Sequence, residues 1–211
     1  MISLPELYAL LYARYGDLGW WPAADAYEMC VGAILTQNTS WNSVEKAIAN
    51  FGGRLSPDHV RSLSDEELTD IIRPSGFFNQ KAQRIRTLTA WLDSLGCLPA
   101  DCTLPTAELR KQLLALKGVG RETADSILVY AFGRLSFVVD AYTRRLLSRL
   151  GYDLPDDYDD IRRMIEASVE PDIYIYNNFH AVIVEQCKQH CLKKPRCEGC
   201  PLDEHCPRNG L

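Results

Sequence analysis

The sequence has no apolar run long enough to cross a membrane, no low-complexity segment and no obvious internal repeat. It also has no segment typical of a secretory signal, and no convincing run of alternating apolar and polar residues. These absences exclude membrane-spanning, repeat and strand-rich architectures. We therefore expect a cytoplasmic protein, and 211 residues are enough for one large or two small domains with an ample core.

Basic side chains are fewer than acidic ones overall, 23 against 28. The formal net charge is −5 and the pI is about 5.4, which argues against non-specific coating of nucleic acid. The distribution is uneven, however. Residues 110–149 contain eight basic and three acidic side chains, whereas residues 151–172 contain eight acidic and two basic ones. We therefore expect one positive face on an acidic molecule.

Apolar residues recur at helical spacing along most of the chain, and Gly and Pro fall between these segments. Ser64 and Glu67 have the spacing of a capping box, which predicts a helix start. The short apolar run Leu135 to Val139 is interpreted as an extended linker. The fold class is therefore all-α. Helices are expected over 4–15, 25–35, 43–51, from 64 onward, and over 81–95, 106–116, 122–132, 140–150, 160–169 and 178–189.

Five of the eight cysteines fall within residues 187–206, and four of them have the spacing C-x5-C-x2-C-x5-C. Four thiolates are the usual ligands of a cubane iron–sulfur cluster or of structural zinc. The alternative is a disulfide knot. The absence of a secretory signal and of any other cysteine framework argues against it. The remaining cysteines, Cys30, Cys97 and Cys102, are scattered, as expected for reduced thiols.

The stretch from Leu116 to Arg121 contains Gly118-Val119-Gly120 between two helical segments. Glycine permits backbone conformations that other residues avoid and lets a phosphate approach closely. The amides that open the following helix would face that phosphate. The pattern predicts a phosphate cradle, and a plain tight turn between helices is the alternative.

Asp140 follows Val138-Val139 at the expected start of a helix, where an aspartate is a good N-cap. The helix dipole keeps such a carboxylate ionised. Most aspartates at this position only cap the helix. A carboxylate near a phosphate-binding hairpin is repelled by phosphate, so we interpret Asp140 as a group that stabilises a cation or activates water.

With these motifs in this order, the chain resembles the endonuclease III superfamily of DNA base-excision glycosylases over nearly its whole length. The resemblance implies a helical domain over 23–134 with the helix-hairpin-helix, and a second over 1–22 plus 135–211 with a [4Fe–4S] cluster. It also implies that DNA lies across the cleft between the domains. The implied catalytic residue is Asp140, and the implied phosphate-binding residues are Gly118, Val119, Gly120 and Arg121.

Bifunctional members of this superfamily carry a lysine just after the hairpin, and that position is Glu122 here. A carboxylate cannot form a Schiff base. Lys117 precedes the hairpin and does not replace that lysine. Together with Trp20-Trp21-Pro22 and Gln37-Asn38-Thr39, Glu122 makes the chain similar to the 3-methyladenine-type branch.

That branch implies three groups of contacts. The base pocket would comprise Trp20, Trp21, Pro22, Trp41 and Glu122. Gln37 would fill the gap left in the duplex, and Phe77 and Asn79 would contact the opposite strand. Two alternatives stay open from the residues alone. The tryptophans could pack a domain junction, and Phe77 or Phe78 could belong to the core.

The cysteine loop departs from the family pattern, because its first gap is five residues instead of six. The ligands implied by the resemblance are Cys191, Cys197, Cys200 and Cys206. Cys187 or His190 is the alternative to Cys191, and zinc is the alternative to the [4Fe–4S] cluster.

The sequence therefore predicts a monofunctional DNA glycosylase that hydrolyses the N-glycosidic bond of a damaged base, an alkylated purine, flipped from duplex DNA. We expect a monomer that associates with the nucleoid through DNA, without a membrane partner. Two other function classes stay open: a glycosylase with lyase activity for oxidised or mismatched pyrimidines, and a DNA-binding module without catalysis.

Overall fold

The computed structural model describes residues 2–210, and all regular secondary structure within that range is helical. The all-α prediction is thus confirmed. The chain divides into two compact units. The hairpin unit is Trp21–Arg134, and the cysteine unit combines the segment up to Trp20 with the segment from Leu135 onward. None of the helices in the described range is long and apolar enough to cross a membrane.

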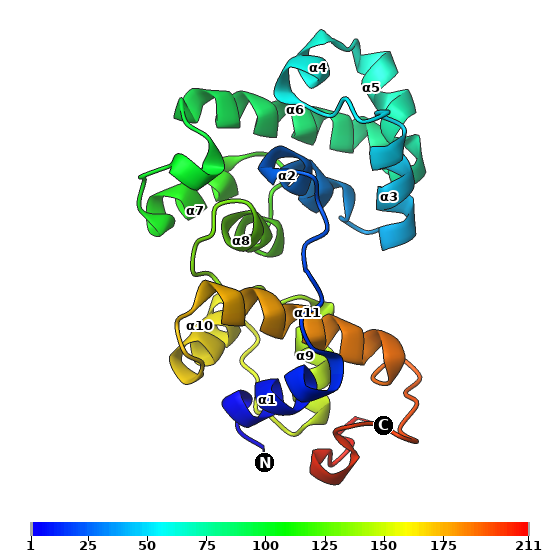
Figure 1. Cartoon of the computed structure of the whole chain (residues 1–211), viewed down its shortest axis with the longest axis vertical. Helices are drawn as coiled ribbons and strands as arrows, with labels where there is room; N and C mark the ends of the chain where they lie inside the picture. Colours follow the sequence, from blue (N-terminus) through cyan, green and yellow to red (C-terminus); the bar gives the residue numbers. More distant parts are fainter. Residues whose placement is uncertain (1, 211) are drawn as a thin grey trace. The chain divides into compact units, whose positions relative to one another are not determined.

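The hairpin unit contains seven α-helices and two short 3₁₀ helices (Figure 1). Serine or aspartate N-caps open α2, α3, α4 and α5, and Ser64 and Glu67 form the predicted capping box of α5. The helix α4 was not anticipated. The elements are α2 (Ala26–Leu35), α3 (Trp41–Ala49), α4 (Pro57–Ser62), α5 (Asp65–Ile72), η1 (Arg73–Ser75), α6 (Phe78–Leu95), η2 (Pro99–Asp101), α7 (Thr106–Ala115) and α8 (Arg121–Tyr130).

The helices α2 and α8 form the centre of the hairpin unit. They pack against each other, and nearly every residue of each is buried. Figure 1 shows α6 as the longest helix of this unit, passing beside α2. Because α2 is apolar around most of its circumference, it is stable only when covered by other helices.

A lysine side chain is buried inside the hairpin unit. Lys81 of α6 is fully buried, and its Nζ donates to the carbonyl oxygens of Leu35 at 2.8 Å and Ser75 at 2.7 Å. These carbonyls belong to the ends of α2 and η1, which have no partner within their own helices. Burial, together with the nearby charge of Arg84, lowers the pKa of Lys81 to about 8.

The cysteine unit is built from α1 (Leu4–Tyr15), α9 (Ala141–Arg149), α10 (Tyr158–Ser168), α11 (Ile173–Gln189) and η3 (Asp203–His205). A capping box of Ser3 and Glu6 opens α1, whose buried leucines pack toward α11. The helix α11 also packs against α9. The hydrophobic core of the cysteine unit is separate from that of the hairpin unit.

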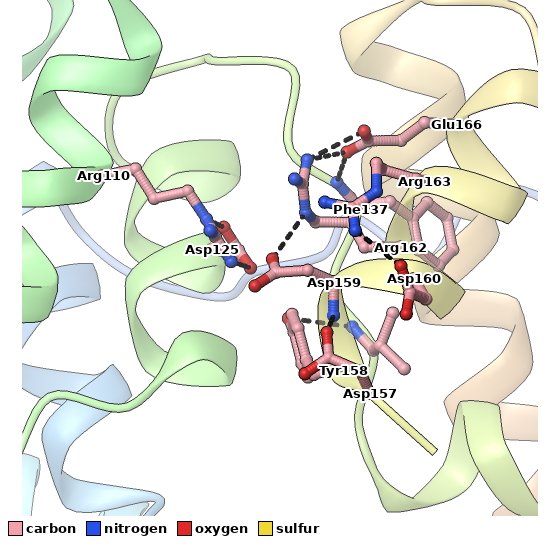
Figure 2. Close-up of polar contacts among 11 residues, drawn as sticks. Arg110, Asp125, Phe137, Asp157, Tyr158, Asp159, Asp160, Arg162, Arg163 and Glu166 are labelled. Carbon is pink, nitrogen blue, oxygen red and sulfur yellow. Dashed lines mark hydrogen bonds and ion pairs between the residues drawn. The ribbon is translucent and has the colours of Figure 1, made fainter. Parts of the chain in front are cut away.

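The predicted linker over residues 135–139 is non-helical, and α10 holds it in place. The Phe137 amide donates to Glu166 Oε1 at 2.8 Å, and the Val139 amide donates to the Tyr158 hydroxyl at 3.2 Å. Figure 2 shows Arg162 beside Glu166, with which it forms an ion pair at 2.8 Å. The segment that leads to Asp140 is therefore fixed by a neighbouring helix.

Candidate functional site

The predicted hairpin lies between α7 and α8. The Val119 amide donates to the Leu116 carbonyl at 3.0 Å, and Gly118 has φ +88°, a conformation that favours glycine. Gly120 is the N-cap of α8 and provides no side chain to cap it. An added Cβ at Gly120 would meet nothing within 4 Å, so the surface there is open to a phosphate.

An ion pair clamps the two helices that flank the hairpin. Arg110 of α7 donates to both carboxylate oxygens of the fully buried Asp125 of α8, at 2.7 and 3.0 Å (Figure 2). Such bidentate pairs fix geometry as well as adding energy. The hairpin amides are therefore presented by a rigid pair of helices.

Gln37 lies on the hairpin. Its Nε2 donates to the Gly118 carbonyl at 3.0 Å and to Thr123 Oγ1 at 2.9 Å, while its Oε1 accepts from Arg84 at 2.5 Å. The structure thus joins two predicted DNA-contacting elements, Gln37 and the hairpin. Arg84 was not anticipated from the sequence.

Phe77 is 62% exposed and has a left-handed backbone, with φ 47° and ψ 30°. An aromatic residue rarely adopts that conformation, and such strain is concentrated at functional sites. Asn79 is also exposed. Phe78 instead packs against the core, and the Arg73 guanidinium lies 4.6 Å from its ring centre. Phe78 therefore takes the core position and Phe77 is available for contact.

Trp21 and Trp41 form an edge-to-face pair with ring centres 5.1 Å apart, and Tyr130 lies 5.5 Å from Trp21. These three half-buried rings form an aromatic cluster of the hairpin unit. Pro22 and Glu122 are exposed, and Glu122 lies in the first turn of α8. Trp20 belongs to the cysteine unit, where Lys188 Nζ lies 5.2 Å from its ring centre.

Asp140 is the N-cap of α9, as expected. Its Oδ1 accepts from the Thr143 amide at 2.7 Å, and Nε2 of His180 from α11 lies 3.4 Å from its Oδ2. Burial would raise the pKa of Asp140, but the contacts with His180 and Thr143 outweigh it and lower that pKa below 3.8. The carboxylate is therefore ionised at neutral pH. His180 was missed because nothing local in the sequence connects it to Asp140.

The four predicted cysteine ligands line one small hollow, together with Arg149, Gln186 and His190. Two side chains donate to their sulfurs. Arg149 Nη1 lies 3.2 Å from Cys191 Sγ, and Gln186 Nε2 lies 3.1 Å from Cys200 Sγ. The pKa of Cys191 is lowered to about 6, first by a hydrogen bond from Cys187 and also by Arg149. Burial acts in the opposite direction but is outweighed.

This donor set fits a thiolate-bound cluster. The four cysteines line a common hollow, and N–H donors to sulfur are a feature of such sites. Cys187 does not line the hollow, and its thiol lies 3.5 Å from the Tyr142 carbonyl. In residues 2–210, however, no three Cys, His, Asp or Glu side chains stand arranged to hold a metal ion. The ligand set accordingly stays a proposal.

Comparison with known proteins places the chain in a family. Residues 31–171 match the HhH-GPD superfamily of base excision DNA repair proteins. A Methanocaldococcus jannaschii protein, inferred to be a DNA repair glycosylase, is 45% identical over 95% of this chain and 94% of its own length.

Two solved structures are also similar. The 3-methyladenine DNA glycosylase of H. pylori bound to 1,N6-ethenoadenine has 30% identity and a TM-score of 0.77, covering 89% of this chain and 98% of that one. A trapped endonuclease III–DNA covalent intermediate has a TM-score of 0.80 at 23% identity, covering 99% and 97%, and shows the fold alone. The chain therefore belongs to the HhH-GPD superfamily and is a base excision repair DNA glycosylase.

Proposed function

We propose that this glycosylase is monofunctional and removes an alkylated purine, leaving an abasic site in an intact strand. The observation that carries the proposal is Glu122, which occupies the position of the lysine in bifunctional members of the superfamily. It is exposed in the first turn of α8. A carboxylate cannot attack the sugar to form a Schiff base, so water must be the nucleophile.

The aromatic cluster of Trp21, Trp41 and Tyr130 supports the choice of base. Aromatic faces stack on an extruded base, and they attract a cationic alkylated ring more than a neutral one. The Glu122 carboxylate adds attraction for positive charge. We assign Pro22 to the same pocket. The likeness to the H. pylori enzyme, named for 3-methyladenine, agrees with a purine lesion.

Asp140 is the proposed catalytic residue. Alkylation at a ring nitrogen already makes the base a good leaving group, so little acid catalysis is needed. As the glycosidic bond breaks, the sugar becomes oxocarbenium-like, and an ionised carboxylate stabilises that charge and directs water onto it. The geometry supports this role, because Asp140 is held by Thr143 and faces His180.

The proposed DNA-contacting residues lie in the hairpin unit. Gly118, Val119, Gly120 and Arg121 would bind the phosphates of one strand. Gln37 would fill the vacated position, for which it must leave its hydrogen bonds to the hairpin. Phe77 and Asn79 would contact the opposite strand. We propose that a single copy of the protein performs these roles.

Cys191, Cys197, Cys200 and Cys206 would hold a [4Fe–4S] cluster, with zinc as the alternative. The cluster supplies a structural cross-link of the loop and no redox step of the hydrolysis. The loop around it carries Lys193, Lys194 and Arg196, which can contact phosphates.

The test is excision from a panel of duplexes carrying alkylated purines, oxidised pyrimidines or mismatched thymine, each analysed with and without hot alkali. We expect strand breaks only after alkali, only with alkylated purines, and no covalent adduct with borohydride. Glu122→Gln, which keeps the size and removes the charge, should weaken selectivity for the cationic base. Breaks without alkali and an efficient adduct would establish lyase activity instead, and no excision at all would leave a DNA-binding module.

A further inference from the structure

A polar groove of about 620 Å³ runs beside the hairpin in the hairpin unit. One wall is a face of α6, the long helix in Figure 1, and the other is the turn before α8. Its lining contains two cations and no carboxylate. The lining residues are Asn79, Gln80, Gln83, Arg84, Thr87, Lys117 and Gly118.

Arg84 is the central cation of this groove. Its guanidinium donates to two neutral carboxamides, Gln37 Oε1 at 2.5 Å and Gln80 Oε1 at 3.3 Å. Within residues 2–210, neither Arg84 nor Lys117 forms an ion pair. By contrast, Arg86 on the same helix pairs with Asp65 at 2.7 Å. Arg84 is thus oriented by hydrogen bonds while its charge stays uncompensated.

The position of Arg84 is fixed by the hairpin itself. A Cβ at Gly118 would lie 2.2 Å from Arg84 Nε and 2.7 Å from its Cδ, so the side chain lies directly on that glycine. A long, flexible side chain loses rotamer freedom when it is packed in this way. A preorganised guanidinium is a better phosphate ligand than a mobile one, because less entropy is lost on binding.

We propose that this groove is a second anion site, which binds a phosphodiester of the DNA backbone through Arg84 and Lys117, next to the phosphates bound by the hairpin amides. The inference rests on the proposed DNA-binding function and adds a site to it. The side-chain amides of Asn79 and Gln80 add neutral polar groups that can donate to phosphate oxygens. The absence of a carboxylate in the lining means that an entering phosphate meets no repulsion from the groove.

The test is the salt dependence of binding to an undamaged duplex, measured with the intact protein. Arg84→Gln should weaken binding at low salt and reduce the slope of log K against log salt by about 0.9 for one lost phosphate contact. Arg84→Lys keeps the charge and should keep most of the slope. Arg61→Gln is the matched control, because Arg61 is ion-paired with Asp58 and Asp93. The control is also distant from the groove, because its partner Asp93 lies nine residues beyond Arg84, about 13 Å along α6.

An unchanged salt slope in Arg84→Gln, or a change no larger than in Arg61→Gln, would overturn the proposed phosphate site. The proposed function is tested separately, because excision by the wild type does not depend on that result. Melting temperatures of Arg84→Gln and Arg61→Gln, compared with the wild type, identify any general loss of folding. If Arg84→Gln is destabilised, the test rests on Arg84→Lys, which should keep most of the slope if the charge of Arg84 binds a phosphate. Inorganic phosphate at constant ionic strength forms a second arm. If it displaces DNA from the wild type but not from Arg84→Gln, phosphate and DNA compete for Arg84, as proposed. If phosphate binds the wild type through Arg84 without lowering the affinity for DNA, the groove binds free phosphate and the assignment to DNA is wrong.

Discussion

The imidazole of His180 faces the carboxylate of Asp140, with Nε2 3.4 Å from Oδ2, and the two side chains are only 6% and 12% exposed. The Thr143 amide binds the other oxygen at 2.7 Å. The carboxylate is therefore oriented by the Thr143 amide, and an imidazole from α11 faces its other oxygen. A catalytic group held in this way needs no reorientation when substrate arrives.

Replacement of Asp140 by Asn tests its role in the reaction. Asparagine is also a good N-cap, so α9 should be retained and only the charge is lost. Excision should fall by a factor on the order of 10² or more, while binding to a lesion duplex is kept or tightened. Single-turnover excision and a binding titration measure the two effects. Unchanged excision would remove Asp140 from the mechanism.

His180 acts through Asp140 in this account, so it is a positioning residue. His180→Ala should lower kcat by about tenfold and leave KM nearly unchanged, because substrate binding does not depend on the orientation of Asp140. In the Asp140→Asn background the same substitution should cost little more, since the partner charge is already absent. Additive losses in the double variant would show that His180 contributes only to general stability.

The two glycines of the hairpin should respond differently to alanine. Gly118→Ala forces a side chain into φ +88° and against Arg84, and the conformation alone costs about 1–2 kcal/mol. Gly120 has room for a methyl group, so Gly120→Ala should fold normally but obstruct the phosphate. Urea unfolding and duplex affinity separate the effects. Equal stability losses in both variants would contradict this reading of the hairpin.

Lys81 gives a pH dependence of stability. Its pKa is about 8 in the folded protein, below its ordinary value of 10.5. Between pH 8 and pH 10.5 the unfolded chain binds more protons than the folded protein, so the stability of the folded protein rises with pH. Below about pH 8 Lys81 is charged in both states, and the cost of burying that charge is fully present. Wild type should therefore gain stability relative to Lys81→Met between pH 7 and pH 10 in urea unfolding. A constant difference would show that Lys81 stays charged throughout.

The cysteine loop predicts a measurable cofactor. As purified, the protein should be brown and contain about four irons and four labile sulfides per chain. Cys197→Ser or Cys200→Ser should remove the colour and reduce the folded yield, whereas Cys187→Ser should keep the colour. A colourless protein with one zinc would favour the alternative metal, and loss of colour in Cys187→Ser would change the ligand set.

Much of the fold could be predicted from local patterns. The N-caps Asp25, Ser64 and Asp140, and the glycine and proline positions, mark helix starts and ends within a few residues. The helix α4 was missed because six residues carry too little periodicity. The linker over 135–139 was found because its apolar run is too short for a helix.

The supporting residues of the site could not be predicted in this way. Arg84 reaches Gly118, His180 reaches Asp140, and Arg149 reaches Cys191, each across more than thirty positions in the sequence. A long basic side chain on a helix is usually solvated. Only the tertiary structure shows that these three contact the motifs, because the motifs themselves have no local signal for their neighbours.

Asp140 caps the helix α9, and Arg149 is its last residue, so the two ends of one nine-residue helix each carry a member of a proposed centre. Arg149 is fastened to the cysteine loop through Cys191 Sγ and the carbonyls of Leu192 and Lys193. An oxidant that dismantled the loop would release that fastening and fray α9 from its far end. The Asp140 carboxylate at the opposite end of the helix would then lose its alignment, although the oxidant never reached it.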